Sequence, residues 1–163
     1  MYSNSKPNLW RGLLAGAIAG LAGSFVMSQF HSMFPKVESS QKQEEDSTVK
    51  TASAVSERIF HHQLTPHEKQ LAGPAVHYAF GSSVAAAYGA AVEAEPFLRI
   101  GKGLPFGVAV WLGAHVITVP ALGLSPSVTA SPPRQEAIEF GAHLLYGATV
   151  EAIRRFIRTR MLR

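Results

Sequence analysis

Two kinds of residue are scarce in this 163-residue sequence, and each scarcity excludes something. There is no cysteine, so a disulfide framework, a thiolate metal site and a cysteine nucleophile are all excluded. Charged residues make up only 16% of the chain, well below the level of about 25% in an average soluble domain. Catalytic motifs are also missing, since no Ser/His/Asp order, phosphate-binding loop or metal motif of recognisable spacing occurs. The sequence therefore gives no indication of an enzyme.

Long stretches without Asp, Glu, Lys or Arg are abundant instead. About 20 predominantly apolar residues suffice to cross a hydrocarbon core as a helix. Four runs qualify, the last being the weakest because it carries Glu139. A soluble bundle is the alternative, but it needs a polar face on every helix, and the run from Gly12 to Phe30 has none. The sequence therefore predicts an all-α membrane protein with four transmembrane helices, at 12–34, 65–95, 104–124 and 135–156.

Basic residues predict the orientation of these helices. Lysine and arginine outnumber acidic residues on one side of the four runs, whereas the long first loop mixes both signs. Cytoplasmic flanks carry an excess of Lys and Arg, so both termini are expected in the cytoplasm. Because the excess sits at the membrane edges, anionic lipid is a better partner for it than nucleic acid. Cytoplasmic segments are predicted at 1–11, 96–103 and 157–163, and the opposite loops at 35–64 and 125–134.

The first run and the first loop carry further signals. No small-residue cleavage site follows the first run, so we expect an uncleaved helix rather than a signal peptide. A capping box with proline at the first helical position, Thr65-Pro66-x-Glu68, predicts the start of the second helix. A short amphipathic helix lying on the bilayer surface is predicted in the loop, from apolar residues at helical spacing: Val49, Ala52, Val55, Ile59 and Phe60.

A repeat is visible in the chain. The segment YGAAVEA, starting at Tyr88, ends the second helix, and YGATVEA, starting at Tyr146, ends the fourth. The odd-numbered helices begin with matching glycines, Gly12 and Gly16 in the first and Gly103 and Gly107 in the third. These matches predict two helix pairs of the same sense, that is, a parallel repeat.

Small residues recur along the helices at the spacing that lets helix backbones approach closely in lipid. Packing inside one chain is the favoured interpretation, because four helices offer enough internal partners; a dimerisation face is the alternative. The helix-packing candidates are Gly12, Gly16, Gly20, Gly23, Gly81, Gly89 and Gly147.

Ionisable residues at membrane depth are the candidates for chemistry: His77, His115, Glu139 and His143. Such groups are costly in lipid and normally face an interior, a cavity or each other. Glu139 and His143 are four residues apart and share a helix face, where a carboxylate can orient an imidazole. The set could relay protons, bind a divalent metal or ligate a haem. Equally, each histidine could be an interhelical hydrogen-bond partner without further function.

The order of several of these motifs resembles the YagU-like bacterial inner-membrane proteins. The similarity covers the first glycine-rich helix and the chain from Thr65 onward, but not the insert from Ser39 to Val55. It implies a multi-pass inner-membrane protein with four helices and periplasmic loops, and histidines that act together. The residues that carry it are His77, Tyr88-Gly89, Glu93, Gly103-Leu104, Gly107, His115, Pro120 to Pro126, Glu139-Phe140-Gly141, His143 and Glu151 to Arg155.

Three functions stay open from the sequence. The best is a proton- or metal-responsive helix bundle that uses the His/Glu band, with a role in transport or as part of a homo-oligomer. The second is a structural or partner-binding membrane subunit, in which these residues only fasten helices. The third is a b-type haem-binding bundle. No particular cofactor is predicted, although haem or a divalent metal would suit the histidines.

Overall fold

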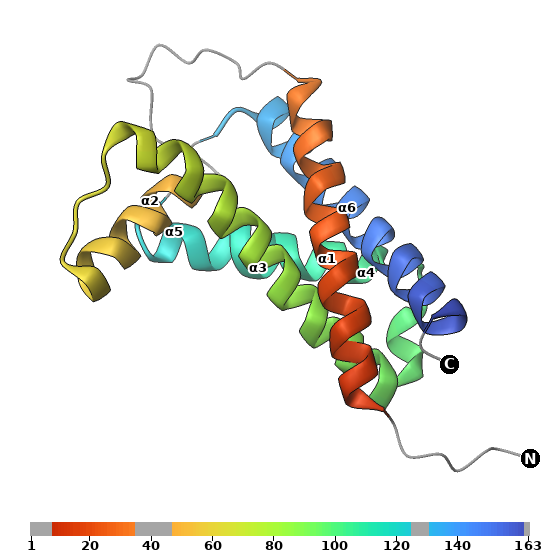
Figure 1. The fold of residues 1–163 in the computed structure, drawn as a ribbon. Coiled ribbons are helices and arrows are strands. Elements are labelled where there is room, and N and C mark those ends of the chain that lie inside the picture. The colour runs from red at the N-terminus through yellow and green to blue at the C-terminus, as the bar shows by residue number, and fades with distance from the viewer. Residues whose placement is uncertain (1–7, 35–46, 125–130, 162–163) are drawn as a thin grey trace, which may run out of the picture.

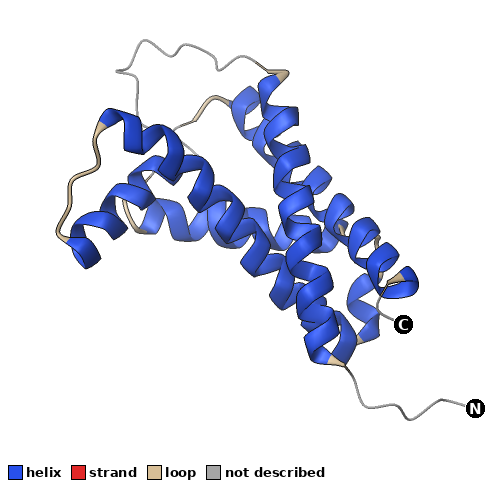
Figure 2. Ribbon diagram, in the orientation of Figure 1, coloured by secondary structure: helices blue, strands red, loops and turns tan. Residues whose placement is uncertain are grey.

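The structure is a computed structural model that describes residues 8–34, 47–124 and 131–161. Within these ranges every regular element is a helix and no strand occurs (Figure 2). The prediction of an all-α chain is therefore confirmed. The polar part of the first loop, residues 35–46, and most of the loop predicted at 125–134 lie outside the described residues, as do residues 1–7 and 162–163.

Three long helices form the centre of the molecule: α1 (Leu9–Ser32), α3 (Pro66–Ala94) and α6 (Pro133–Arg160). Helix α1 packs against both α3 and α6. In Figure 1, α1 and α6 run side by side while α3 crosses them and diverges towards one end. Buried side chains between these helices include Met27, Tyr88, Tyr146 and Val150.

The third apolar run forms a helix of mixed type. It begins as α4 (Leu104–Val110), continues as the π-helix η3 (Trp111–Thr118) and ends as the short α5 (Val119–Ala121). Helix α4 packs on α6, but the rest of the run leaves the centre and passes behind α3 in Figure 1. Only 6% of its 18 residues are buried. The expected continuous helix at 104–124 is therefore interrupted by the wider π-helical turns.

The loop after α1 carries a helix, as the amphipathic pattern predicts. Helix α2 (Ser47–Val55) is followed by the π-helical turn η1 (Ser56–Phe60). Rather than standing apart from the bundle, α2 packs along the first half of α3, where Val49 covers Gly73. A 3-10 turn, η2 (Pro96–Arg99), links α3 to α4.

The start of α3 confirms the predicted capping box. Thr65 caps the helix by accepting from the Glu68 backbone N–H, and the Glu68 carboxylate accepts in return from the Thr65 backbone N–H at 2.7 Å. Further hydrogen bonds come to this carboxylate from the Thr65 hydroxyl and the His62 ring. Together these bonds, the backbone one first, lower the pKa of Glu68 to about 2.

Glycines form the closest contacts between helices. A Cβ on Gly12 would lie 2.5 Å from the carbonyl oxygen of Gly89, and one on Gly16 would strike the Ala85 carbonyl. The same holds between α4 and α6, where a Cβ on Gly103 would strike the Gly147 carbonyl. On Gly107 it would strike the carbonyl of His143. All four contacts are made within one chain. The contacts of Gly12 and Gly16 in the first motif correspond in sequence position to those of Gly103 and Gly107 in the second.

Candidate functional site

Polar side chains converge at the end of the bundle remote from the described ends of the chain. His31 lies in the last turn of α1 and Glu136 in the first turn of α6. Helix dipoles favour a cation at the first position and an anion at the second. The π-helix η3 brings a third element to the same place, because its His115 contacts α6.

Two histidine–carboxylate pairs form this site. The Nε2 atom of His31 lies 3.2 Å from the Oε2 atom of Glu139, which joins α1 to α6. The Nε2 atom of His115 lies 3.0 Å from the Oε2 atom of Glu136, which joins η3 to α6. All four side chains are partly buried, with Glu136 the least exposed at 14%. Each pair is therefore shielded in part from bulk solvent and still reachable by protons.

His143 lies deeper, beside both pairs. Its Nδ1 atom is 2.7 Å from the backbone carbonyl oxygen of Glu139, and since a carbonyl only accepts, Nδ1 carries the proton. The neutral ring therefore keeps the lone pair on Nε2. The ring centroids of His115 and His143 are 5.9 Å apart. The predicted pairing of the Glu139 carboxylate with His143 does not occur, because that carboxylate reaches His31 instead.

An aromatic wall adjoins the site. Trp111 stacks near His115 with ring centroids 6.4 Å apart and meets Phe140 edge-on at 5.0 Å. The indole therefore lies in contact range of the site on the same helix as His115, one turn away. A change in the charge of His115 would alter the surroundings of this fluorophore.

Of the four residues predicted to carry chemistry, the structure brings together His115, Glu139 and His143. His77 lies apart, with its Nε2 atom 3.4 Å from the carbonyl oxygen of Ser24, two turns before His31 on α1. The sequence reasoning missed His31 and Glu136. Glu136 could have been found, because residues 136, 139 and 143 share one helix face. His31 gave no such signal, since its partner lies on a helix remote in sequence.

A metal centre finds no support in the described part of the chain. Among those residues, no three His, Asp or Glu side chains are arranged so that they could hold a metal ion. The metal and haem interpretations therefore stay predictions.

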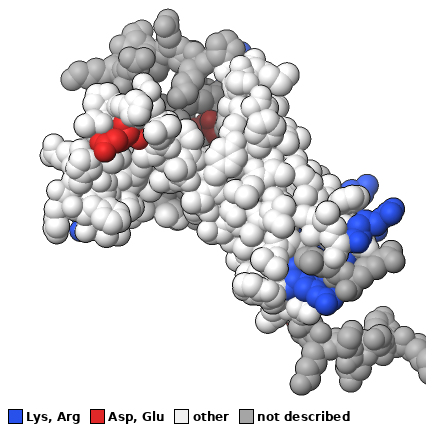
Figure 3. Space-filling view, viewed as in Figure 1, with Lys and Arg blue, Asp and Glu red and all other residues white. Residues whose placement is uncertain are grey.

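The fold and composition define the class of the protein. Two helices, Leu9–Ser32 and Leu104–Ala121, are long and apolar enough by length and composition to cross a membrane. The middle of the face shown in Figure 3 is free of charge, and basic side chains gather near the end of α6. These features are those of a helical membrane protein.

Comparison with known proteins gives the family. The chain belongs to the family described as "Protein of unknown function (DUF1440)", whose sequence model matches residues 21–152. The inner membrane protein YagU of Escherichia coli (strain K12) is 31% identical over 85 residues, which are 52% of this chain and 42% of that protein. The chain thus matches less than half the length of this curated relative. The resemblance to the YagU-like inner-membrane proteins is confirmed. No solved structure matches the chain.

Proposed function

We propose that the chain crosses the inner membrane four times, through α1, α3, α4–α5 and α6, with both termini in the cytoplasm. Two of these helices, Leu9–Ser32 and Leu104–Ala121, are long and apolar enough to cross a membrane. The other two, with 29 and 28 residues, are long enough at about 1.5 Å per residue to cross a core of about 30 Å. Their internal carboxylates are paired, as in Glu139 with His31 and Glu151 with Arg154.

The arrangement of the helices supports this topology. The start of α1 and the end of α6 lie at the same end of the molecule (Figure 1). Basic side chains gather at that end (Figure 3), which is the distribution expected of a cytoplasmic face. The contacts of Gly12 with Gly89 and of Gly103 with Gly147 support the parallel repeat within this topology.

Within this frame, the His/Glu site is proposed to make the protein proton-responsive. The observation that carries the proposal is the convergence of two histidine–carboxylate pairs, from three helices, around the buried His143. A histidine beside a carboxylate changes charge near physiological pH, and the pair is strong only while the imidazole is protonated. With the bundle placed as above, the site faces the periplasmic side.

The weakly packed third helix is the element that such a change would move. Beyond Val110 it leaves the bundle, and His115 and Trp111 are the contacts that hold its π-helical part to α6. When His115 is protonated, its bond to Glu136 is charge-assisted and holds η3 in place. When His115 loses its proton, the bond weakens and η3 is freer to move away from α6.

Trp111 offers a direct test. The chain contains two tryptophans, so Trp10→Phe leaves Trp111 as the only indole. We expect its emission in proteoliposomes to change in one step as the pH is varied. His115→Gln should abolish the step, and Glu136→Gln should reduce it, because each removes one partner of the bond that joins η3 to α6.

His77→Gln is the matched control, since it removes a histidine of α3 that bonds to a carbonyl outside the site. It should leave the step unchanged. A pH-independent emission of Trp111, or an equal loss of the step in His77→Gln and His115→Gln, would overturn the proposal. Proton flux into the same vesicles, measured with an enclosed pH-sensitive dye, would show whether the response is coupled to transport.

A second candidate, the structural or partner-binding subunit, rests on other observations. Tyr146 donates a hydrogen bond to the Gly81 carbonyl oxygen at 2.6 Å, and Ser82 donates one to the Ala17 carbonyl at 3.1 Å. These side chains fasten helices and offer no titratable chemistry near neutral pH. If the His/Glu site does the same, its variants would lower thermal stability in detergent and leave the emission of Trp111 independent of pH.

A further inference from the structure

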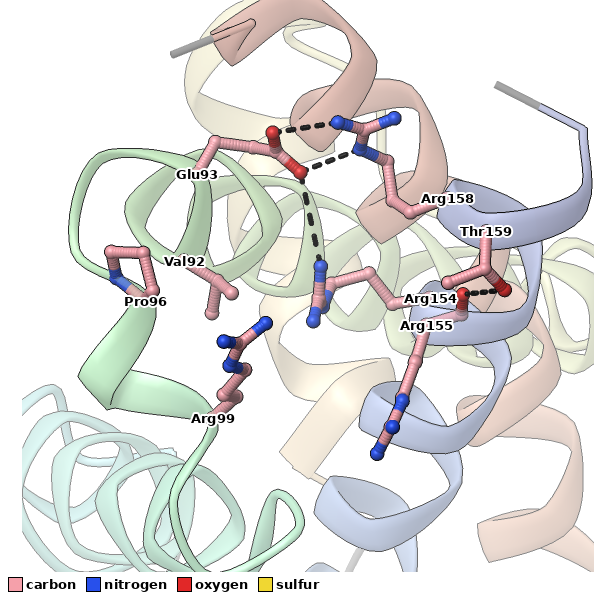
Figure 4. A pocket seen from close by; sticks show the side chains of 8 residues that line it. All are labelled: Val92, Glu93, Pro96, Arg99, Arg154, Arg155, Arg158 and Thr159. Atoms are coloured by element: carbon pink, nitrogen blue, oxygen red, sulfur yellow. Dashed lines mark hydrogen bonds and ion pairs between the residues drawn. The ribbon is translucent and has the colours of Figure 1, made fainter. Parts of the chain in front are cut away.

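A second concentration of charge lies at the opposite end of the bundle, where α3 ends and α6 leaves the core. Here a pocket of about 360 Å³ is lined by Val92, Glu93, Pro96, Arg99, Arg154, Arg155, Arg158 and Thr159 (Figure 4). Four of its eight lining residues are arginines and one is acidic. No part of the His/Glu site contributes to it.

Two of the arginines are committed to carboxylates. Arg158 donates from Nε and Nη2 to the two oxygens of Glu93, at 2.5 and 2.8 Å, which raises the pKa of Arg158. Arg154 makes the corresponding forked contact with Glu151, at 2.7 and 2.8 Å. Both arginines are thus held in fixed positions and neutralised by acidic residues of the protein.

The other two arginines have no such partner. The side chains of Arg99 and Arg155 make no hydrogen bond or ion pair with any residue in the described ranges. Figure 4 shows the guanidinium group of Arg99 turned across the pocket towards that of Arg154. Like charges facing each other repel, so an anion between them is favoured. The four arginines together with Glu93 and Glu151 carry a net charge of +2 at this site.

Exposed apolar residues flank the lining residues in the sequence. Phe97, Ile100 and Phe156 are 63%, 72% and 58% exposed, and each is adjacent or close in sequence to a lining residue. Apolar side chains next to arginine guanidinium groups suit a ligand that combines hydrocarbon chains with an anionic group. That anionic group should accept two hydrogen bonds from one guanidinium. Planar guanidinium groups match the oxygens of a phosphate in pairs.

We propose that this pocket binds the phosphate of an anionic lipid headgroup at Arg99, on the side that faces Arg154, with Arg155 adding a second positive charge that no acidic residue of the pocket neutralises. The group that is recognised is a phosphate, either esterified in a lipid or free. Its source is lipid in the membrane leaflet or free phosphate in solution, and the flanking apolar residues favour lipid. The site is independent of the His/Glu site and of any proton response.

The test uses the purified full chain in detergent, mixed with equal amounts of phosphatidylglycerol and phosphatidylcholine, with bound lipids counted by native mass spectrometry. Wild type should retain phosphatidylglycerol in preference. Arg99→Gln with Arg155→Gln should reduce this preference about ten-fold or more, because each arginine near an anionic headgroup contributes several-fold to binding. Arg58→Gln with Arg134→Gln removes the same charge from η1 and from the start of α6, neither of which lines the pocket, and should change the preference less than about two-fold.

Further arms make each result decisive. If the glutamine variant does not fold, Arg99→Lys with Arg155→Lys replaces it, and lysine, which keeps the charge without the fork, should still lower the preference. Displacement of phosphatidylglycerol by millimolar inorganic phosphate would show that the site accepts free phosphate; no displacement would assign it to lipid. Both results support the proposal. It is overturned if wild type shows no preference, or if the pocket and control variants lose it equally.

Discussion

The α1–α3 pair and the α4–α6 pair begin alike and then diverge. Gly12 meets Gly89 and Gly16 meets Ala85 in the first pair; Gly103 meets Gly147 and Gly107 meets His143 in the second. Four residues further along, Gly20 of α1 touches Gly81 of α3. The corresponding positions of the second pair hold Trp111 and Glu139. The close approach of backbones stops there, and the π-helix begins at Trp111.

The difference shows how two helix pairs with similar glycine contacts can carry different side chains further along. His115 stands where the first pair has Ser24, and Glu139 where it has Gly81. These positions therefore hold large ionisable side chains in place of small ones, and both belong to the His/Glu site. The first pair has small residues at its contact positions, whereas the second provides four of the five ionisable residues of the site, the fifth being His31 of α1.

The largest expected effect comes from the glycines that hold each pair together. Gly16→Ala should lower the free energy of unfolding by about 2–3 kcal/mol, because its methyl group strikes the Ala85 backbone. Gly107→Ala should cost less, about 1–2 kcal/mol, because α4 packs mainly on α6, with Phe106 stacked on Tyr88 of α3, and the helix beyond it is loosely held. Unfolding in detergent, followed by circular dichroism, measures both.

Gly113→Ala is the matched control, since a Cβ there meets nothing within 4 Å. It should change the unfolding free energy by less than about 0.5 kcal/mol. Equal losses in Gly16→Ala and Gly113→Ala would contradict the assignment of the tight contact to the first pair.

A smaller effect is expected where the two pairs are joined. Tyr146→Phe removes the buried hydrogen bond to Gly81 and should cost about 1 kcal/mol. Tyr88→Phe, at the matching position, should cost less, about 0.5 kcal/mol, because Glu151 keeps both bonds from Arg154. The same unfolding measurement gives the loss in each variant. A larger loss in Tyr88→Phe than in Tyr146→Phe would mean that the bond from Tyr88 to Glu151 contributes more to stability than the bond from Tyr146 to Gly81.

The smallest effect concerns helix caps, which only the first pair has. Side chains of Asn8 and Thr65 cap α1 and α3, whereas α4 and α6 have no side-chain cap. With a folded pKa of about 2 against about 4.3 in the unfolded chain, Glu68 stabilises α3 fully above pH about 4.3. This stabilisation is lost as the pH falls towards 2.

A carboxyl titration by NMR should give Glu68 a midpoint near 2. Thr65→Ala removes the hydroxyl donor and should raise that midpoint part of the way to about 4.3. An unchanged midpoint in Thr65→Ala would show that the hydroxyl bond contributes nothing to the depressed pKa.

Sequence periodicity predicts local elements of this molecule well and contacts between remote ones poorly. The all-helical class and the α3 capping box follow from apolar runs and from Thr65, Pro66 and Glu68, and the structure confirms both. The shared face of Glu139 and His143 was also readable. That the Glu139 carboxylate turns to His31, and that η3 becomes π-helical, depend on which helices meet, and no local pattern encodes that.

The glycine contacts also set an order for biogenesis. About 80 residues separate Gly12 from Gly89, but only about 45 separate Gly103 from Gly147, so at about 5–20 residues per second the first contact waits about 4–15 s and the second about 2–9 s. During the longer wait α1 is without the helix that it packs against most closely in the folded chain. The first helix of this pair therefore waits longest for its partner, which suits α1, a helix long and apolar enough to cross a membrane.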